Sequence, residues 1–128
     1  MVQSFRLKFQ FIGIYIAEAH AIDEWPISES PRDFKPHHCI EDRIEACRYL
    51  LQDYSSYLHG IEFYVDIMDD DGVNESFEAA YASWPFRFWV LSSTQVLFKA
   101  MPKDACYDLR DLEIFLTEFY YGQKRDNV

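Results

Sequence analysis

The sequence has few basic residues and no long hydrophobic run. Lys and Arg together number 12 against 22 Asp and Glu, so the formal net charge is −10. Nucleic acids and anionic membrane surfaces attract clustered positive charge, so this balance argues against both partners. The longest nearly continuous apolar stretch, residues 9–17, spans nine residues and includes Gln10, whereas a membrane helix requires roughly 20. No charged start with a small-residue cleavage site is present, so we expect a soluble chain without a membrane segment.

Cysteines are also few. The three present, Cys39, Cys47 and Cys106, form no CxxC or CxxxC pair. A disulfide framework would have an even number of cysteines at close spacing, so this pattern favours a reducing compartment, and we expect a cytoplasmic location.

What is abundant is hydrophobic and aromatic side chains. The 128 residues are 49% hydrophobic and 18% aromatic, which is enough to build one core and excludes overall disorder. We expect a single domain over residues 1–122, followed by a polar tail at residues 123–128.

Hydrophobic periodicity predicts an α/β fold. Residues 5–17 begin with strict alternation at Phe5, Leu7, Phe9 and Phe11, which is typical of a strand. Residues 40–58 carry an apolar stripe at spacings of three and four, with acidic residues in the first turn and Gly60 at the end of the helix. The other predicted elements are a strand at 61–67, a short helix at 75–82, a hairpin at 86–91 and 95–100, and a final helix capped by Asp108. Residues 21–38 contain three prolines and form a long loop.

This order of elements corresponds to the C-terminal portion of a thioredoxin-like fold. The strand and helix that would precede it are missing. Their loss should leave a strand edge and an apolar sheet face uncovered, with the row from Phe5 to Phe11 as a candidate aggregation or dimerisation surface.

The segment from Tyr15 to Trp25 is the richest in chemical groups. Glu18 and His20 would leave the end of the first strand on the same face, with Asp23 and Trp25 in the following loop. This arrangement predicts an acid–base pocket. The alternative is a packed histidine beside ordinary solvated acidic residues.

The pattern Tyr-Ile-x-Glu-Ala-His-x-x-Asp-x-Trp in this segment resembles the signature of the iodothyronine deiodinases, which have a thioredoxin-like fold related to the peroxiredoxins. The resemblance covers residues 9–120. It continues in His37, in Ile40-Glu41-Asp42-Arg43, in Val65-Asp66-Ile67-Met68-Asp69, in residues 81–90 and in Tyr107 with residues 109–116.

The resemblance implies an oxidoreductase that removes iodine reductively from iodinated phenols such as thyroid hormones. A thiol reductant is the cosubstrate, and no other cofactor is expected. Glu18, His20 and His37 would be catalytic, while His20, Arg87 and Trp25 would bind the substrate. Asp23 and Pro85 would be structural, Pro85 at the position of a cis-proline typical of thioredoxin-like folds. The resemblance also implies a homodimer, and animal members of the family carry a membrane anchor.

This chain departs from the family pattern at important positions. Ala17 and Phe86 stand where the family usually has glutamates. The selenocysteine or cysteine nucleophile of the family would lie upstream of the first predicted strand, and none of the three cysteines matches its position. We therefore expect this chain to be inactive on its own. Two interpretations remain: an incomplete deiodinase-like enzyme, or a non-catalytic thioredoxin-like domain that binds an aromatic acid or a protein.

Two weaker patterns concern metals and thiols. The run His37-His38-Cys39 has no second paired cluster, so it is a weak zinc signal, and residues 67–78 do not match a calcium loop because position one would lie within a strand. No metal is expected. Cys39 lies near the start of a predicted helix, which could lower the pKa of its thiol, but we do not expect this thiol to be reactive.

Overall fold

A computed structural model describes residues 1–23, 35–68, 76–101 and 107–125, with side chains up to residue 122. The chain divides into two compact units. One unit is Phe11–Pro85, and the other combines Met1–Gln10 with Phe86–Val128. Both α-helices and β-strands are present, so the predicted mixed α/β class is confirmed.

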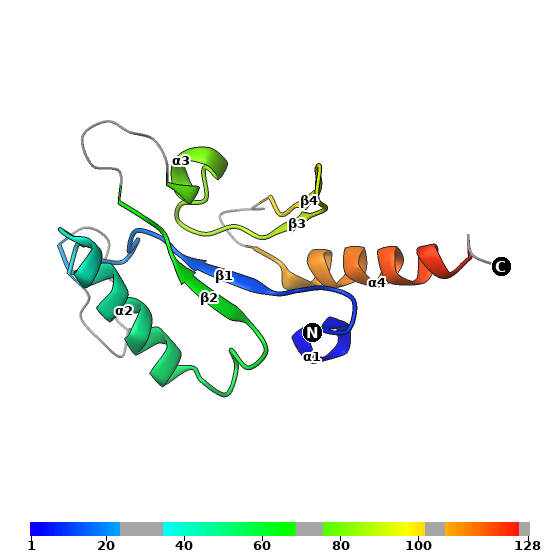
Figure 1. Cartoon of the computed structure of the whole chain (residues 1–128), viewed down its shortest axis with the longest axis horizontal. Helices are drawn as coiled ribbons and strands as arrows, with labels where there is room; N and C mark the ends of the chain where they lie inside the picture. Colours follow the sequence, from blue (N-terminus) through cyan, green and yellow to red (C-terminus); the bar gives the residue numbers. More distant parts are fainter. Residues whose placement is uncertain (24–34, 69–75, 102–106, 126–128) are drawn as a thin grey trace. The chain divides into compact units, whose positions relative to one another are not determined.

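The first unit, Phe11–Pro85, is built on a strand–helix–strand motif. Strand β1 (Ile12–Tyr15) pairs in parallel with β2 (Glu62–Val65), from Ile12 opposite Glu62 to Tyr15 opposite Val65. Two further backbone bonds extend this ladder, from the Glu62 N–H to the Phe11 carbonyl and from the Asp66 N–H to the Tyr15 carbonyl. Helix α2 (Ile40–Asp53) connects the strands and runs alongside them (Figure 1). The predicted order of strand, helix and strand is therefore confirmed.

Helix α2 begins at an acidic cap. The Asp42 carboxylate accepts the backbone N–H groups of His38 and Cys39 at 2.9 and 3.2 Å, so a side chain of the first turn fixes the backbone that leads into the helix. The face buried most deeply carries Arg43, Ala46 and Cys47.

The predicted end of this helix is wrong. Helix α2 ends at Asp53, and the Tyr54 N–H makes the last helical bond to the Leu50 carbonyl. The next residues, Tyr-Ser-Ser-Tyr, are weaker helix formers than the residues before them, and they form a turn instead. Gly60, with φ of 89°, lies further on in the connection to β2 and does not end the helix.

Helix α3 (Phe77–Tyr81) is short and capped from two directions. The Ser76 hydroxyl accepts the Ala79 N–H at 3.0 Å, as an N-cap residue does. The buried Asp66 carboxylate, just after β2, accepts the N–H groups of Phe77 and Glu78 at 2.7 and 3.0 Å. The helix ends at Tyr81, and the next residue, Ala82, has a left-handed φ of 50°. The first unit closes with Trp84–Pro85, whose peptide bond is cis.

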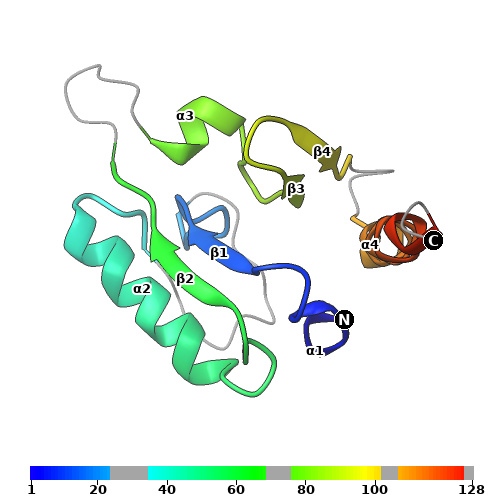
Figure 2. The ribbon, with the colours of Figure 1, turned by 45° about the vertical axis from the view of Figure 1, so that its right-hand side comes forward.

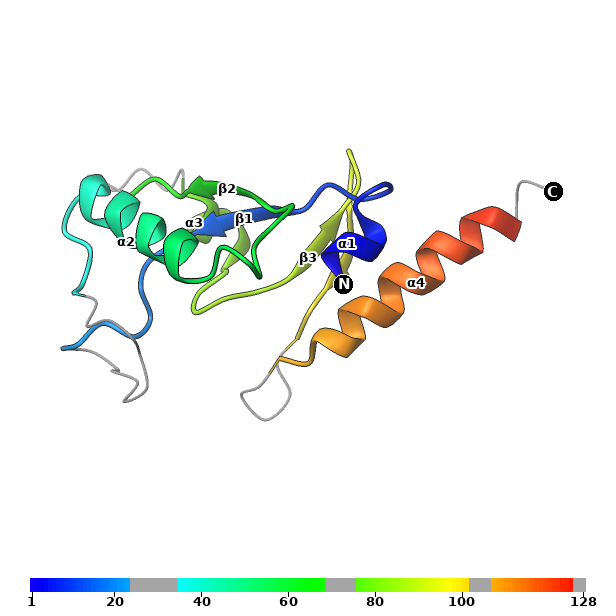
Figure 3. The same cartoon turned by 90° about the horizontal axis from the view of Figure 1, so that it is seen from below.

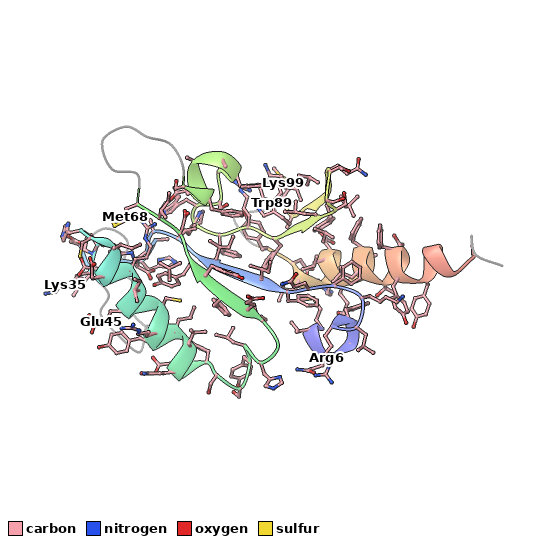
Figure 4. All side chains as sticks on the ribbon, viewed as in Figure 1. Arg6, Lys35, Glu45, Met68, Trp89 and Lys99 are labelled. Atoms are coloured by element: carbon pink, nitrogen blue, oxygen red, sulfur yellow. The ribbon has the colours of Figure 1, made fainter. Side chains whose placement is uncertain are left out.

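The second unit contains a hairpin and two helices. Strand β3 (Trp89–Leu91) pairs antiparallel with β4 (Val96–Lys99), with Trp89 opposite Lys99 and an irregularity between Val90 and Leu91. This confirms the predicted hairpin, shown in a second view in Figure 2. The Lys99 ammonium lies 4.6 Å from the centre of the Trp89 ring (Figure 4), a cation–π contact that supports the pairing.

Helix α4 (Leu109–Arg125) supplies the apolar core of this unit. The ring of Phe115 lies 5.0 Å from that of Phe98 in β4, and Leu112 and Leu116 are buried. The Asp108 carboxylate accepts the Arg110 N–H at 2.9 Å, which confirms the predicted cap. The helix is continuous to Arg125 (Figure 3), so the first residues of the predicted tail are helical.

The predicted strand over residues 5–17 is wrong in its first half. Helix α1 occupies Val2–Phe5, and the Phe9 N–H bonds to the Phe5 carbonyl at 3.0 Å. Residues 5 and 9 are also four apart, so one helical turn brings their rings to 6.2 Å, and Phe9 packs 5.9 Å from Phe119. Leu7 is 91% exposed. The alternating row therefore does not form the sheet face on which the aggregation or dimerisation surface was predicted.

The strands form two separate two-stranded sheets within the described residues. Among the described residues, no helix has both the length and the apolar character needed to cross a membrane.

Candidate functional site

Glu18 organises the turn that follows β1. Its carboxylate accepts the Tyr15 hydroxyl at 2.9 Å with one oxygen and the backbone N–H of His20 at 3.0 Å with the other. Ala19 and Ala21 are buried on either side of His20, and Ala21 has no exposed surface. The prediction that Glu18 and His20 leave a strand on one face is wrong, because β1 ends at Tyr15. The carboxylate binds the backbone of His20 instead and shapes the turn.

Tyr15 is the hydrogen-bond donor of this cluster. Burial and the neighbouring Glu18 carboxylate raise the pKa of Tyr15 well above its ordinary value. Both causes disfavour the phenolate, so the hydroxyl keeps its proton at physiological pH. Tyr15 is therefore a fixed donor to Glu18.

The ring of His37 lies against Tyr15. The two ring centres are 5.9 Å apart, and both imidazole nitrogens are buried without a hydrogen-bond partner among the residues the structure describes. Burial and the positive charge of Arg43 lower the pKa of His37, against the opposing effect of Glu18. A neutral imidazole beside a carboxylate can accept a proton at neutral pH, as a general base does.

Arg43 is the fixed positive charge near this cluster. It is 6% exposed, and its Nη1 donates to the carbonyls of Asp66 and Ile67 at 3.0 and 2.9 Å. A guanidinium suits this bridging position because it remains charged when it is buried. The bonds connect helix α2 to the end of β2, the same point at which Asp66 caps α3.

Arg87 lies in the second unit, in an aromatic setting. Its Nη1 donates to the Tyr107 hydroxyl at 3.0 Å. The Tyr107 ring lies 4.4 Å from that of Phe86 and 6.0 Å from that of Phe88. An arginine held in this way has a defined direction, which suits the binding of a carboxylate or a phenolate.

The remaining predicted site residues have different surroundings. Asp23 is exposed in the turn after Ala21. Trp25 lies outside the described residues. Pro85 follows the cis bond at the end of the first unit. The structure thus joins Glu18 to Tyr15 and to the backbone of His20, and it places the His37 ring against Tyr15.

Three residues with clear structural roles were not assigned any role from the sequence: Tyr15, Arg43 and Tyr107. All three lie in the motifs that carry the family resemblance. Of the three, Tyr15 is the residue whose role the sequence could best indicate, because it lies only three residues before Glu18 at the end of a strand. The contacts of Arg43 with Asp66 and of Arg87 with Tyr107 span 23 and 20 residues, and no local pattern indicates such pairs.

The thiols in the described residues are not activated. Cys39 is exposed. A backbone hydrogen bond with Asp42 lowers its pKa, but desolvation and side-chain hydrogen bonds with Asp42 and Glu41 outweigh it and raise the pKa overall. The helix start therefore does not lower the pKa of Cys39 overall. Burial raises the pKa of Cys47, and Cys106 lies outside the described residues. Within the described ranges, no group of three His, Cys, Asp or Glu side chains is placed to hold a metal ion.

Comparison with known proteins gives a consistent result. The sequence matches the family Iodothyronine deiodinase over residues 1–120. It is 29% identical over 112 residues to the thyroxine 5-deiodinase of Sparus aurata, covering 88% of this chain and 39% of that protein. It is 27% identical over 119 residues to the human thyroxine 5-deiodinase, covering 93% and 36%. With the type I iodothyronine deiodinase of Xenopus laevis the identity is 29% over 99 residues, covering 77% and 35%.

The chain thus spans well under half the length of these curated relatives, with 39%, 36% and 35% of each covered. The family match nevertheless extends over nearly the whole chain, including Tyr15, Glu18, His37, Arg87 and Tyr107. This protein chain belongs to the iodothyronine deiodinase family.

Proposed function

We propose that this chain carries the proton-handling and substrate-binding residues of a thiol-dependent deiodinase that acts on iodinated phenols. The observation that carries the proposal is the cluster of Tyr15, Glu18 and His37, in which a carboxylate holds a protonated phenol beside a buried neutral imidazole. Membership of the deiodinase family supports the assignment of this cluster to reductive removal of iodine.

The chemistry requires proton transfers as well as a nucleophile. An iodine atom passes from a ring carbon to a selenium or sulfur atom, and the carbon takes up a proton in its place. Two thiols then reduce the selenium–iodine or sulfur–iodine bond, which releases iodide and a disulfide. His37, neutral and packed against Tyr15, is suited to accept the phenolic proton of the substrate and to return it. Glu18 and Tyr15 would hold the orientation of that site.

The nucleophile of this reaction is proposed to lie outside residues 1–128. Both cysteines in the described residues have raised pKa values, which is the opposite of an activated thiolate. The relatives are also much longer than this chain. We propose further that the mixed α/β units belong to a thioredoxin-like domain related to the peroxiredoxins, as the family resemblance implies.

Substrate binding is assigned to Arg87, His20 and Trp25. Arg87 is suited to the carboxylate or phenolate of the ligand, because a guanidinium donates two parallel hydrogen bonds to such groups. Phe86, which is 49% exposed beside Arg87, offers an apolar surface for an aromatic ring. His20 and Trp25 are proposed from the family resemblance alone.

The experiment measures binding and catalysis separately. Thyroxine is titrated into the purified chain by calorimetry, and iodide release is measured with dithiothreitol as reductant. We expect binding without iodide release. The Arg87→Ala variant should bind at least tenfold more weakly, since a charge-assisted bond to a carboxylate is worth about 1.5–3 kcal/mol.

Arg110→Ala is the matched control for this substitution. Arg110 is an exposed arginine of the same unit, paired with Asp108, and its removal should leave the affinity unchanged. Equal affinities of the wild type and Arg87→Ala would contradict the assignment of Arg87. Thiol-dependent iodide release by the chain alone would contradict the proposal that its nucleophile lies elsewhere. If a longer form of the protein that includes the proposed nucleophile binds thyroxine but releases no iodide, the second candidate function, a non-catalytic binding domain, is favoured.

A further inference from the structure

The surroundings of Arg87 contain a device for holding its side chain in one direction. Arg87 and Tyr107 are 20 residues apart in the sequence, yet the Arg87 Nη1 donates to the Tyr107 hydroxyl at 3.0 Å. Arg87 precedes β3, whereas Tyr107 precedes α4. The bond is partly buried, so water competes with it less than it would at an open surface.

Tyr107 is itself fixed by aromatic contacts. The Phe86 ring lies 4.4 Å from the Tyr107 ring at an angle of 48° between the ring planes. The Phe88 ring meets it edge-on at 6.0 Å and 84°, and the rings of Phe86 and Phe88 contact each other at 5.7 Å. Edge-to-face and tilted arrangements at these separations are favourable. The two residues that flank Arg87 in the sequence therefore hold the tyrosine that Arg87 binds.

Such an arrangement has a consequence for ligand binding. A free arginine side chain has many rotamers, and the entropy lost when it is immobilised weakens binding. An arginine that is already ordered by a hydroxyl loses less. The guanidinium has five N–H donors in one plane, so a bond at Nη1 also sets the plane in which the other donors lie.

We propose that Tyr107 is a positioning residue for Arg87, and that its hydroxyl, held by Phe86 and Phe88, orders the guanidinium for an anionic group of the ligand. The inference rests on the proposed function, and of the two anionic groups named there for Arg87 it takes the carboxylate of the iodinated phenol. It adds a residue that does not touch the ligand but determines how well the carboxylate is bound.

The test compares two ligands that differ only at the anionic group. Thyroxine and its carboxamide are titrated into the wild type, Tyr107→Phe and Arg87→Ala. Tyr107→Phe keeps the ring and its aromatic contacts and removes only the hydroxyl. We expect it to lower the affinity for thyroxine about fivefold, the effect of one hydrogen bond, and to leave the affinity for the carboxamide within twofold. Tyr121→Phe, at an exposed tyrosine of α4, is the control and should change neither.

Each outcome has a distinct meaning. If the wild type and Arg87→Ala bind thyroxine equally, the proposed function fails at Arg87, whatever Tyr107 does. If Arg87→Ala weakens binding but Tyr107→Phe matches the wild type, the positioning role is overturned. If Tyr107→Phe weakens both ligands equally, its effect is structural, and the positioning role is again overturned.

A second variant keeps the proposal testable if Tyr107→Phe does not fold. Phe86→Leu retains the Tyr107 hydroxyl and removes the ring packed 4.4 Å from it. Because Phe86 is also proposed to contact the ligand's ring, both ligands should bind more weakly, and thyroxine should lose about twofold more affinity than the carboxamide. If the ratio of the affinities for thyroxine and its carboxamide is the same in this variant as in the wild type, the claim that Phe86 holds Tyr107 is overturned.

Discussion

Asp66 is the residue on which the structure makes the sharpest prediction about stability. It lies directly after β2 and is 5% exposed. Its two carboxylate oxygens accept the N–H groups of Phe77 and Glu78, the first two residues of α3. Its backbone carbonyl accepts a hydrogen bond from Arg43 of α2. Asp66 thus connects the strand to two helices, and only the connection to α3 depends on its side chain.

The effect of Asp66→Ala follows from those two bonds. The substitution leaves two backbone donors at the start of α3 without their acceptor. An unsatisfied buried donor costs about 1–3 kcal/mol, and Phe77 and Glu78 are only half-buried, so water compensates in part. We expect the free energy of unfolding to fall by about 3 kcal/mol. That is a large fraction of the roughly 5–15 kcal/mol by which domains of this size are stable.

Two smaller changes serve as matched controls. Asp66→Asn keeps one carbonyl oxygen and turns an amide group towards the other donor, so we expect a loss of about 1.5 kcal/mol. Ser76→Ala removes the third capping bond, from the Ala79 N–H, and we expect a loss of about 1 kcal/mol. The expected order of destabilisation is Asp66→Ala first, then Asp66→Asn, then Ser76→Ala.

Urea unfolding followed by circular dichroism measures these differences. The reasoning is refuted if Asp66→Ala lies within about 0.5 kcal/mol of the wild type, or if Ser76→Ala is more damaging than Asp66→Ala. Either result would mean that α3 is held by its packing and not by the carboxylate after β2.

Two further predictions concern His37 and Gly13. The pKa of His37 is lowered from 6.5 in the folded state, so the unfolded chain binds the proton more readily; stability should fall as the pH drops below about 6.5 towards the folded pKa. The free energy of unfolding, measured from pH 8 to 5, should fall less in His37→Asn than in the wild type, whereas the control variant at the exposed His38, His38→Asn, should lose as much as the wild type. If His37→Asn shows the wild-type pH profile, protonation of His37 is not the cause of the loss. A Cβ at Gly13 would lie 2.5 Å from Cε1 of Phe63, so Gly13→Ala should cost about 1–3 kcal/mol. In the double variant with Phe63→Leu, part of the stability lost through Gly13→Ala should be recovered. If thermal unfolding shows that the losses of the two single variants simply add, the proposed clash between the two side chains is contradicted.

The elements predicted well from the sequence are those with a strong local pattern and a long-range partner. The helix predicted from the apolar spacing of residues 40–58, the strand predicted at 61–67 and the final helix capped by Asp108 all appear in the structure, as α2, β2 and α4. The hairpin of β3 and β4 was also predictable, because a polar turn of Ser, Ser and Thr separates two apolar runs. In each case the residues that form the element also determine which face is buried.

The predictions failed where two periodicities fit the same residues. The row Phe5, Leu7, Phe9 and Phe11 alternates as a strand does, but Phe5 and Phe9 are also spaced as neighbours on a helix. The contact between Phe9 and Phe119 decides between the two, and it joins residues 110 positions apart. The end of α2 was missed for a related reason. Tyr54 and Leu58 continue the apolar spacing, although the backbone turns after Asp53.

The candidate site shows the same division between local and distant information. The Tyr15–Glu18–His20 turn lies within six residues, so its groups can be found in the sequence, although the sequence does not indicate that Glu18 accepts the Tyr15 hydroxyl and the backbone N–H of His20. His37 acquires its properties from burial and from Arg43, whose position depends on carbonyls at the end of β2. The titratable groups of the candidate site are therefore visible in the sequence. The burial and the Arg43 charge that lower the pKa of His37 depend instead on the packing of α2 against the end of β2, which pairs with β1. A change that leaves every predicted site residue in place but disturbs that pairing should alter the protonation of His37.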